Sequence, residues 1–482
     1  MHRSVAQGRR ADPGPNPDTT GSPGARLAPW LVVAVGLLLV LLALAVYGAT
    51  YVHRYYDHFV WQAAAFLEGH AAIRYPVAPT GLLPGNAYFQ DVLPIQTADG
   101  VARGLLPFPP LPALVLLPFV ALWGVSVDDQ LVFTILAAID VGLCWWALGR
   151  LPIRPLVRLG TTVFFAFGTV FWYTAQISTT WYQAHIVAVG LTFLAVGVAL
   201  GNDRAATTLA PPTKGRSGLP ALVARPVLAG LLFGLAATAR LTVVFGAPFF
   251  AFVGAGTTRR RILSAGLGAA IPLGVLILYN VSTTGRVFHP AYDHLYRIET
   301  AGYPTLGYRP DWAAEDPRYL LHNLGIGLLG TPDLFPSALP ESLAIAPTPV
   351  CLTPGATRGL FDVACPLAVP RDTGLSVLLT SPAYLLALPV LGRFGRNRLV
   401  TGAVLAVGLI AIVNLMHFSQ GWVQFGYRFS NDAAPFAVLL VALGFERLAS
   451  RRRWWTPAAV GLIALSLAIN LWGVMWSRLL GW

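Results

Sequence analysis

The chain has 482 residues, of which 55% are hydrophobic and 11% charged, and its mean hydropathy is +0.62. Soluble domains carry about 25% charged residues, so this composition excludes a globular enzyme with a single anchor and predicts an all-α polytopic membrane protein. The net charge of +12 would favour nucleic acid in a soluble chain. Here the basic residues form clusters between apolar segments, which is typical of topology signals beside anionic lipid, and we expect no nucleic-acid partner.

Residues 1–29 are rich in Pro, Gly, Arg and Asp and have no apolar period, which predicts a disordered cytoplasmic tail. The following apolar run is too long for a signal-peptide core and lacks a clear cleavage site. It opens a membrane-embedded domain over 30–482. A bilayer core takes about 20 apolar residues per helix, and on this basis we expect eleven spans, at 30–50, 129–149, 159–176, 182–200, 226–239, 241–256, 262–281, 374–391, 399–417, 433–446 and 456–477.

The distribution of charge predicts the orientation. With eleven crossings and a cytoplasmic N-terminus, the cytoplasmic ends hold 21 of the 33 basic residues and four of the 21 acidic ones. Loops that stay in the cytoplasm retain Lys and Arg, so this parity fits and the opposite one does not. Two long segments, 51–128 and 282–373, then lie on the outer face. Arg, Ala, Gly and Pro are abundant and Lys is nearly absent, which indicates a GC-rich bacterial genome and hence the bacterial plasma membrane.

Two apolar regions are unusual. Residues 108–124 contain four Pro, and counting them as a crossing would reverse every later loop; we expect a helix lying in the outer interface. Residues 226–239 and 241–256 are each too short to cross a core of about 30 Å. We expect the chain to turn between them at Arg240, beneath the outer surface, where a charged side chain usually marks a site or a pairing.

The first outer loop supplies two candidate catalytic carboxylates. Residues 53–70 have apolar positions at helical spacing and predict an amphipathic interfacial helix. Asp57, beside His58, could act as a base on a bound hydroxyl, or it could be an acid favoured by a helix N-terminus. Asp91 could be a second carboxylate, a sugar-hydroxyl ligand or a metal ligand, and a solvated loop acid is equally compatible with its context.

Cationic and aromatic residues supply candidate binding groups. The planar guanidinium of Arg240 matches phosphate oxygens, and the alternative is an ion pair with an acid of a neighbouring helix. Residues 417–432 provide Arg428 as a second cation, and an aromatic belt at the interface would explain their rings but not their polar density. The further candidates for substrate contacts are Trp422, Gln424, Tyr427, His58, His185 and Asp293.

Other motifs are few. Cys351 and Cys365 share an outer loop, where they could form a disulfide or remain as two thiols, and Cys144 lies in an expected span. No Walker, GxSxG or HExxH motif occurs, which argues against nucleotide hydrolysis, a serine hydrolase and a zincin. We expect no cofactor and no metal site, although a divalent metal requirement stays open. An outer-face transferase would need a donor carried by lipid, since free nucleotides are not kept outside.

The order of several segments resembles the GT-C superfamily of integral membrane glycosyltransferases. These segments are YYDHFVWQAAAFLEGH, LLPFPPLPALVLLPFVALWG, LGRLPIRPLVR, GLAATAR, GLSVLLTSPAYLLA and GWVQFGYRFSND. The resemblance implies a helical bundle, a polyprenyl-phosphate sugar donor and a catalytic Asp in the first outer loop, matched best by Asp57 with Asp91 in reserve. It implies phosphate roles for Arg240 and Arg428. The chain lacks the large C-terminal soluble domain of better-known members, so 282–373 would recognise the acceptor.

The expected function is therefore transfer of a sugar from a polyprenyl-phosphate donor to a glycan, lipid or protein acceptor on the outer face of the membrane. Two rival functions remain. A transporter or lipid flippase would show internal symmetry and charged or broken helices along a pathway, and the only clear acid within a span is Asp140. A non-catalytic protein of envelope assembly would tolerate loss of both Asp57 and Arg240.

Overall fold

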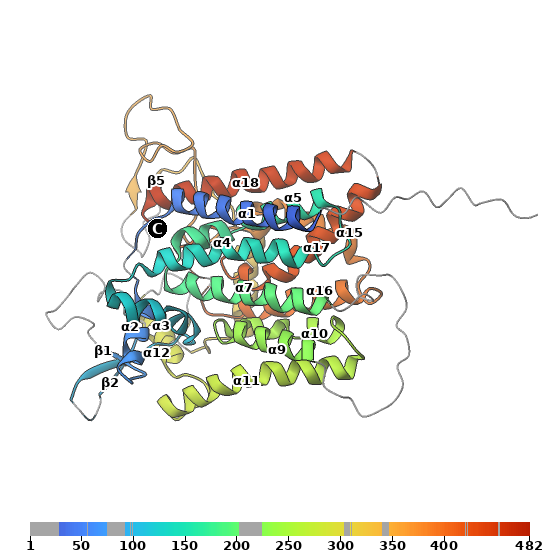
Figure 1. The fold of residues 1–482 in the computed structure, drawn as a ribbon. Helices are drawn as coiled ribbons and strands as arrows, with labels where there is room; N and C mark the ends of the chain where they lie inside the picture. Colours follow the sequence, from blue (N-terminus) through green and yellow to red (C-terminus); the bar gives the residue numbers. More distant parts are fainter. Residues whose placement is uncertain are drawn as a thin grey trace, which may run out of the picture.

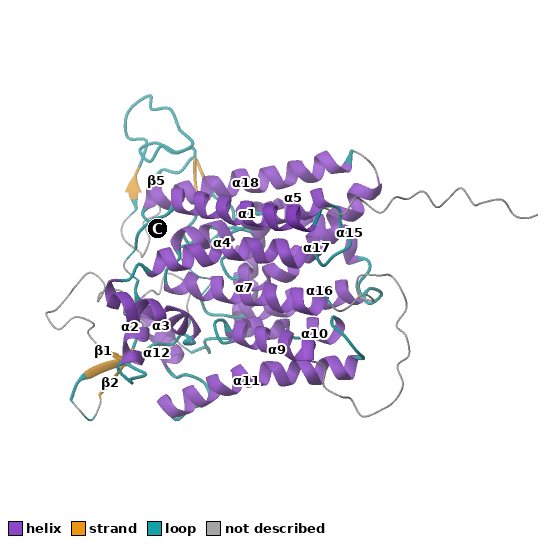
Figure 2. Cartoon of the chain, viewed as in Figure 1, coloured by secondary structure: helices purple, strands orange, loops and turns teal. Residues whose placement is uncertain are grey.

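The computed structural model describes residues 28–54, 56–74, 92–96, 98, 100–201, 224–302, 309, 311–339, 347–419, 421, 423–451 and 454–482. These residues are mostly helical, with a few short strands (Figure 2). The prediction of an all-α polytopic membrane protein is confirmed at this level. The expected tail at 1–29 lies almost wholly outside the described residues.

Seven described helices are long and apolar enough to cross a membrane. They are α1 (Pro29–Thr50), α4 (Asp129–Leu148), α7 (Thr180–Leu200), α11 (Thr258–Thr284), α16 (Arg398–Leu415), α17 (Ser430–Arg451) and α18 (Trp455–Leu480). An eighth span is formed if α5 (Pro155–Phe167) and α6 (Phe171–Ile177), which meet at 47°, are counted together. By length and composition, the described residues thus give seven or up to eight spans, and the expected count of eleven is not confirmed.

Shorter helices occupy the three remaining expected spans. The pair predicted around Arg240 consists of α9 (Ala224–Ala237) and of η3 (Leu241–Gly246) with α10 (Pro248–Phe252). Arg240 precedes the first residue of η3, so the turn falls where the sequence places it. The third expected span, 374–391, is not one helix. It consists of α14 (Val377–Thr380), η6 (Pro382–Ala387) and α15 (Leu388–Leu391).

The break within 374–391 has a local and a tertiary cause. Pro382 cannot donate a backbone hydrogen bond, so it begins a new helical segment. Helix α18 satisfies the backbone groups that the break leaves open: the Ser466 hydroxyl accepts from Ala383 N at 3.0 Å and the Asn470 amide donates to Thr380 O at 2.8 Å. Such compensation by neighbouring helices allows broken helices inside a bilayer.

The long helices lie side by side, and the two ends of the bundle differ (Figure 1). One end, which we call the loop end, carries α2 (His58–Leu67), α3 (Leu111–Trp123), η2 (Gly124–Ser126), α12 (Ala291–Gly302), η5 (Pro317–Tyr319), α13 (Leu320–Leu329) and the strands. The opposite end, the basic end, is where α5, α11, α16 and α18 begin. Arg154, Arg260 and Arg398 lie at these helix starts, in line with the predicted charge segregation.

The expected interfacial segments form short helices at the loop end. Residues 108–124 contribute α3, whose 13 residues reach about 20 Å, less than a bilayer core. Helix α3 packs against α2, which is shorter than the 53–70 predicted. Helix α13 is a third short apolar helix and belongs to the second long loop.

Small antiparallel strands, which the sequence analysis did not predict, stiffen the two long loops. In the first, β1 (Ile73–Arg74), β3 (Ala102–Leu105) and β2 (Leu93–Gln96) form a sheet in that order, with Ile73 opposite Gly104. In the second, β4 (Asp333–Leu334) pairs with β7 (Ala368–Val369), and β5 (Ala338–Leu339) pairs with β6 (Thr348–Pro349). The disulfide left open by the sequence is formed between Cys351 and Cys365.

Helix α7 lies at the centre of the bundle and α1 at its margin. In the most apolar stretch of each span, 83% of the residues of α7 are buried but only 17% of those of α1. Helices α9 and α11 approach closely because Gly230, Gly234 and Gly268 face the partner backbone, where a Cβ would overlap it. The first turn of α7 therefore emerges in the middle of the loop end, where the candidate site residues gather.

Candidate functional site at the loop end

The linker between α1 and α2, which carries Asp57, is held from two sides. Gln130, in the first turn of α4, accepts a hydrogen bond from Arg54 N at 2.8 Å and donates to Val52 O at 3.2 Å. At the start of α7, the Thr180 hydroxyl donates to Tyr56 O at 2.8 Å. Hydrogen bonds from α4 and α7 therefore hold the described backbone next to Asp57.

Asp57 occupies the N-cap position of α2, but its side chain makes no capping hydrogen bond. Its carboxylate is partly buried and has no ion-pair or hydrogen-bond partner among the described residues. Burial raises the pKa of Asp57 above its usual value, an effect opposed by His58 and His53 and reinforced by Asp128. An acid placed only to cap a helix would be hydrogen-bonded to it, so the capping alternative is the weaker interpretation.

Aromatic rings connect Asp57 to the far side of the loop end. Its neighbours Tyr56 and His58 both pack on Trp181, with ring centres 4.8 and 5.6 Å apart. From His58 the contacts continue at 6.1 to 6.4 Å and end with a 5.8 Å contact to Phe429. We call this set the aromatic string; its members are Tyr56, Trp181, His58, Phe108, Tyr292, His417 and Phe429.

Two guanidinium groups lie on the last ring of the aromatic string. Arg240 and Arg428 are 5.2 and 5.3 Å from the centre of the Phe429 ring, distances at which a cation is attracted to the ring face. Arg428 also lies 5.3 Å from the Tyr182 ring. The aromatic string thus runs from the two neighbours of Asp57 to both predicted phosphate-binding arginines.

Arg240 forms an ion pair with Asp432, which belongs to the 417–432 cluster. The sequence did not indicate that these two residues would meet. The Arg240 Nε and Nη2 donate to Asp432 at 3.2 and 2.9 Å. Asp432 is fully buried in the first turn of α17 and also accepts from Thr242 at 2.7 Å and Asn414 at 3.2 Å. Arg240 therefore forms the ion pair that was the alternative to a phosphate site, and its side chain remains 16% exposed.

His185 belongs to the same buried network. Its Nδ1 lies 2.8 Å from Asp432 Oδ1, and because an ionised carboxylate only accepts hydrogen bonds, Nδ1 carries the hydrogen. Its buried Nε2 has no hydrogen-bond partner among the described residues. His185 thus orients Asp432 from α7, while Arg240 holds it from the turn between the two short helices.

Arg428, by contrast, has no carboxylate partner in the described part of the chain, and its buried Nε makes no hydrogen bond there. Gly421 permits its position, since a Cβ there would lie 2.8 Å from that Nε. Val423, two residues on, has φ of 53°, a strained value for a β-branched residue. Its carbonyl accepts hydrogen bonds from Tyr173 and Tyr182 at 3.2 and 3.4 Å.

Arg54 is a second incompletely paired guanidinium that the sequence analysis missed. Its Nη1 donates to His53 O at 3.0 Å, while its buried Nη2 has no partner among the described residues. Burial lowers the pKa of Arg54, an effect offset in part by the nearby hydroxyls of Tyr173, Tyr56 and Tyr182. Arg428 lies on the Tyr182 ring, so both arginines are near this tyrosine. In the sequence, the available signal was a cation three residues before Asp57.

The remaining predicted residues have structural partners or are not described. Gln424 is buried, accepts from Arg428 N at 3.1 Å and donates to Thr373 O at 3.3 Å, so it shapes the loop. Tyr427 donates to Asn414 O at 3.2 Å. Asp293 forms an exposed ion pair with Arg297 on α12. Asp91 and Trp422 lie outside the described residues.

His58 is fully buried and its Nδ1 lies 2.9 Å from the Thr180 hydroxyl, so it supports the linker rather than facing solvent. Within the described ranges, no group of three or more His, Cys, Asp or Glu side chains is arranged to hold a metal ion. No protein-family model, no curated protein and no solved structure matches the chain. The function of the site is therefore inferred from its own residues and not from a similar protein.

Proposed function

We propose that the chain is a multi-pass glycosyltransferase of the GT-C type in a bacterial plasma membrane. It would move a sugar from a polyprenyl-phosphate donor to a glycan, lipid or protein acceptor at the loop end, which would face outward, with the N-terminus in the cytoplasm. The eleven-span topology belongs to this proposal. The observation that carries it is the Asp57 carboxylate, which has no hydrogen-bond partner among the described residues and is joined by the aromatic string to cations that these residues pair incompletely.

In the proposed reaction, Asp57 accepts the proton of an acceptor hydroxyl as that oxygen bonds to the anomeric carbon. The bond from this carbon to the phosphate oxygen breaks, and its electron pair leaves with the lipid phosphate. A raised pKa suits a carboxylate to this step, since it makes the group a stronger base. A single displacement inverts the anomeric configuration.

Cations are needed where charge develops on the leaving phosphate. Arg428 and Arg54 are the better candidates because each has a guanidinium nitrogen without a partner among the described residues. Arg240 would contribute only its remaining exposed edge, and its main role would be to fix Phe429 and the start of α17 through Asp432. The half-buried rings of the aromatic string, such as that of Trp181, would offer faces on which a sugar can stack.

The test is transfer of a labelled sugar from polyprenyl-phosphate donors in membranes that contain the full chain. Wild type should produce a glycosylated acceptor with inverted configuration, and Asp57→Asn should lose most of the activity. Glu68→Gln, at the other end of α2 in an exposed ion pair with Arg74, is the matched control and should remain active. Equal transfer by wild type and Asp57→Asn would remove the base assignment.

A failure of wild type to transfer from any such donor would remove the transferase proposal itself. Movement of the intact donor across the bilayer without transfer would favour the flippase alternative. Normal envelope assembly in cells that carry only the Asp57→Ala, Arg240→Ala double variant would favour the non-catalytic alternative.

A further inference from the structure

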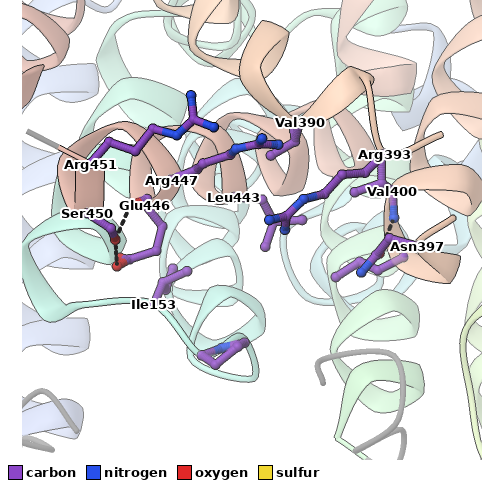
Figure 3. A pocket seen from close by; sticks show the side chains of 12 residues that line it. Ile153, Val390, Arg393, Asn397, Val400, Leu443, Glu446, Arg447, Ser450 and Arg451 are labelled. Carbon is purple, nitrogen blue, oxygen red and sulfur yellow. Dashed lines mark hydrogen bonds between the residues drawn. The ribbon is translucent and has the colours of Figure 1, made fainter. Parts of the chain in front are cut away.

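A cavity of about 400 Å³ lies at the basic end, opposite the proposed transfer site (Figure 3). It is enclosed by the turn before α5, by α15 and the start of α16, and by the last turns of α17. Its apolar wall includes Ile153, Val400 and Leu443, and its cationic residues are Arg393, Arg447 and Arg451. An apolar wall beside three cations is an amphiphilic surface.

The acid in the wall of this cavity is already engaged. Glu446 accepts hydrogen bonds from Arg154 N at 2.8 Å, from Arg154 Nε at 2.9 Å and from the Ser450 hydroxyl at 3.2 Å. Figure 3 shows its carboxylate turned toward Ser450, away from the guanidinium of Arg393. Glu446 therefore neutralises Arg154, and within the described ranges no acid pairs with the three arginines of the cavity.

The three arginines repel one another, and one of them is held by a hydrogen bond. Arg447 Nη1 donates to Pro389 O at 2.7 Å, which fixes this guanidinium against α15. Arg393 and Arg447 are half-buried, and neither they nor Arg451 forms an ion pair with the described part of the chain. Like charges gathered beside an apolar wall are poorly screened, so an anion in the cavity would relieve their repulsion.

A further donor lines the cavity at the start of α16. Asn397 caps this helix by accepting from Val400 N at 3.0 Å, which leaves its amide hydrogens available and places the positive end of the helix dipole at the cavity. Guanidinium groups pair with phosphate oxygens through parallel hydrogen bonds. The cavity thus combines phosphate donors with a surface for a small apolar group.

We propose that this cavity binds a phosphate group at the basic end of the bundle. An anionic phospholipid of the adjacent leaflet would supply both the phosphate and an apolar glycerol and acyl portion for the wall. A soluble phosphate would use the arginines alone. Basic pockets between spans on the cytoplasmic side are suited to lipid headgroups.

The experiment measures lipid retention by the full chain with native mass spectrometry after purification into nanodiscs of phosphatidylglycerol and phosphatidylcholine. Wild type should retain phosphatidylglycerol in preference to phosphatidylcholine. The Arg393→Gln, Arg447→Gln variant should lower this retention about 25-fold, since each of the two cations near an anionic headgroup contributes roughly fivefold. Arg396→Gln, an exposed arginine of the same turn that does not line the cavity, should leave retention unchanged.

A second arm measures the thermal stability of the protein in an uncharged detergent with and without inorganic phosphate. If phosphate stabilises wild type but not the double variant, and wild type does not retain lipid selectively, the site is supported and its ligand is a soluble phosphate. Arg451→Gln, exposed at the last residue of α17, should lower binding about fivefold without a folding defect, so a misfolded double variant still leaves a test. The proposal would be overturned if neither lipid binding nor phosphate binding differed between wild type, Arg451→Gln and the double variant.

Discussion

Replacement of Asp432 by Asn should destabilise the protein more than any change to an exposed ion pair. The wild-type carboxylate accepts from Arg240, Thr242, Asn414 and His185 and is fully buried. Asn keeps one acceptor oxygen and places an NH₂ group where donors already point. It also leaves the Arg240 guanidinium, whose side chain is only 16% exposed, without its counter-charge.

The magnitude follows from the burial of the pair. Removal of one partner from a buried ion pair costs about 3–5 kcal/mol, whereas exchange of both partners for apolar residues of similar size is often neutral. We therefore expect Asp432→Asn to lower the free energy of unfolding by about this amount. The double variant Arg240→Met, Asp432→Leu should recover only part of the loss, because Thr242, Asn414 and His185 still lose the acceptor to which they donate.

The assay is unfolding of the purified chain in detergent, followed by circular dichroism as SDS is added. Asp293→Asn is the control, because the Asp293–Arg297 pair is 64% and 74% exposed and such pairs contribute about 0–1 kcal/mol. A loss in Asp432→Asn no larger than in Asp293→Asn would refute the inference that this network holds the site together.

Three further predictions concern different parts of the molecule. Transfer should decline as the pH falls through the raised pKa of Asp57, because this carboxylate must be ionised to act as a base, and Asp57→Asn should abolish this acid limb of the pH–rate profile. The same raised pKa means that the folded protein loses stability as the pH rises through it, so Asp57→Asn should raise the melting temperature near neutral pH. Replacement of Cys351 and Cys365 by Ser should speed proteolysis of the second long loop and leave the melting of the helix bundle unchanged, because the disulfide closes a local loop with a separation of 14 residues. Gly230→Ala should cost about 1–3 kcal/mol by forcing α9 from α11, whereas Gly266→Ala, whose Cβ would meet nothing within 4 Å, should be tolerated in the same unfolding assay.

The apolar spans could be predicted because length and hydropathy decide whether a segment enters a bilayer. The break in 374–391 could not, since it depends on Ser466 and Asn470 of α18 to satisfy the open backbone groups. The small strands of the long loops were also missed, because strands of two to four residues leave too short a pattern to distinguish from a turn.

The candidate site shows the same division. The turn at Arg240 could be predicted from two short apolar runs between basic ends, but its partner Asp432 lies 192 residues further on. The sequence left phosphate binding and ion pairing open, and tertiary packing supplies the ion pair. Arg54 was missed because its importance comes from two tertiary features that a local pattern does not contain. Its Nη2 has no partner among the described residues, and its guanidinium lies near Tyr182.

The central claim is that Asp57 removes the proton while other residues hold the donor. Its most direct test is the dependence of the transfer rate of Asp57→Asn on donor concentration. A lost general base lowers kcat about 10²–10⁴-fold, and the KM for the polyprenyl-phosphate donor should stay within about threefold of wild type, since Asp57 contributes little to phosphate binding. A wild-type kcat in this variant, or a defect that lies wholly in donor KM, would contradict the account.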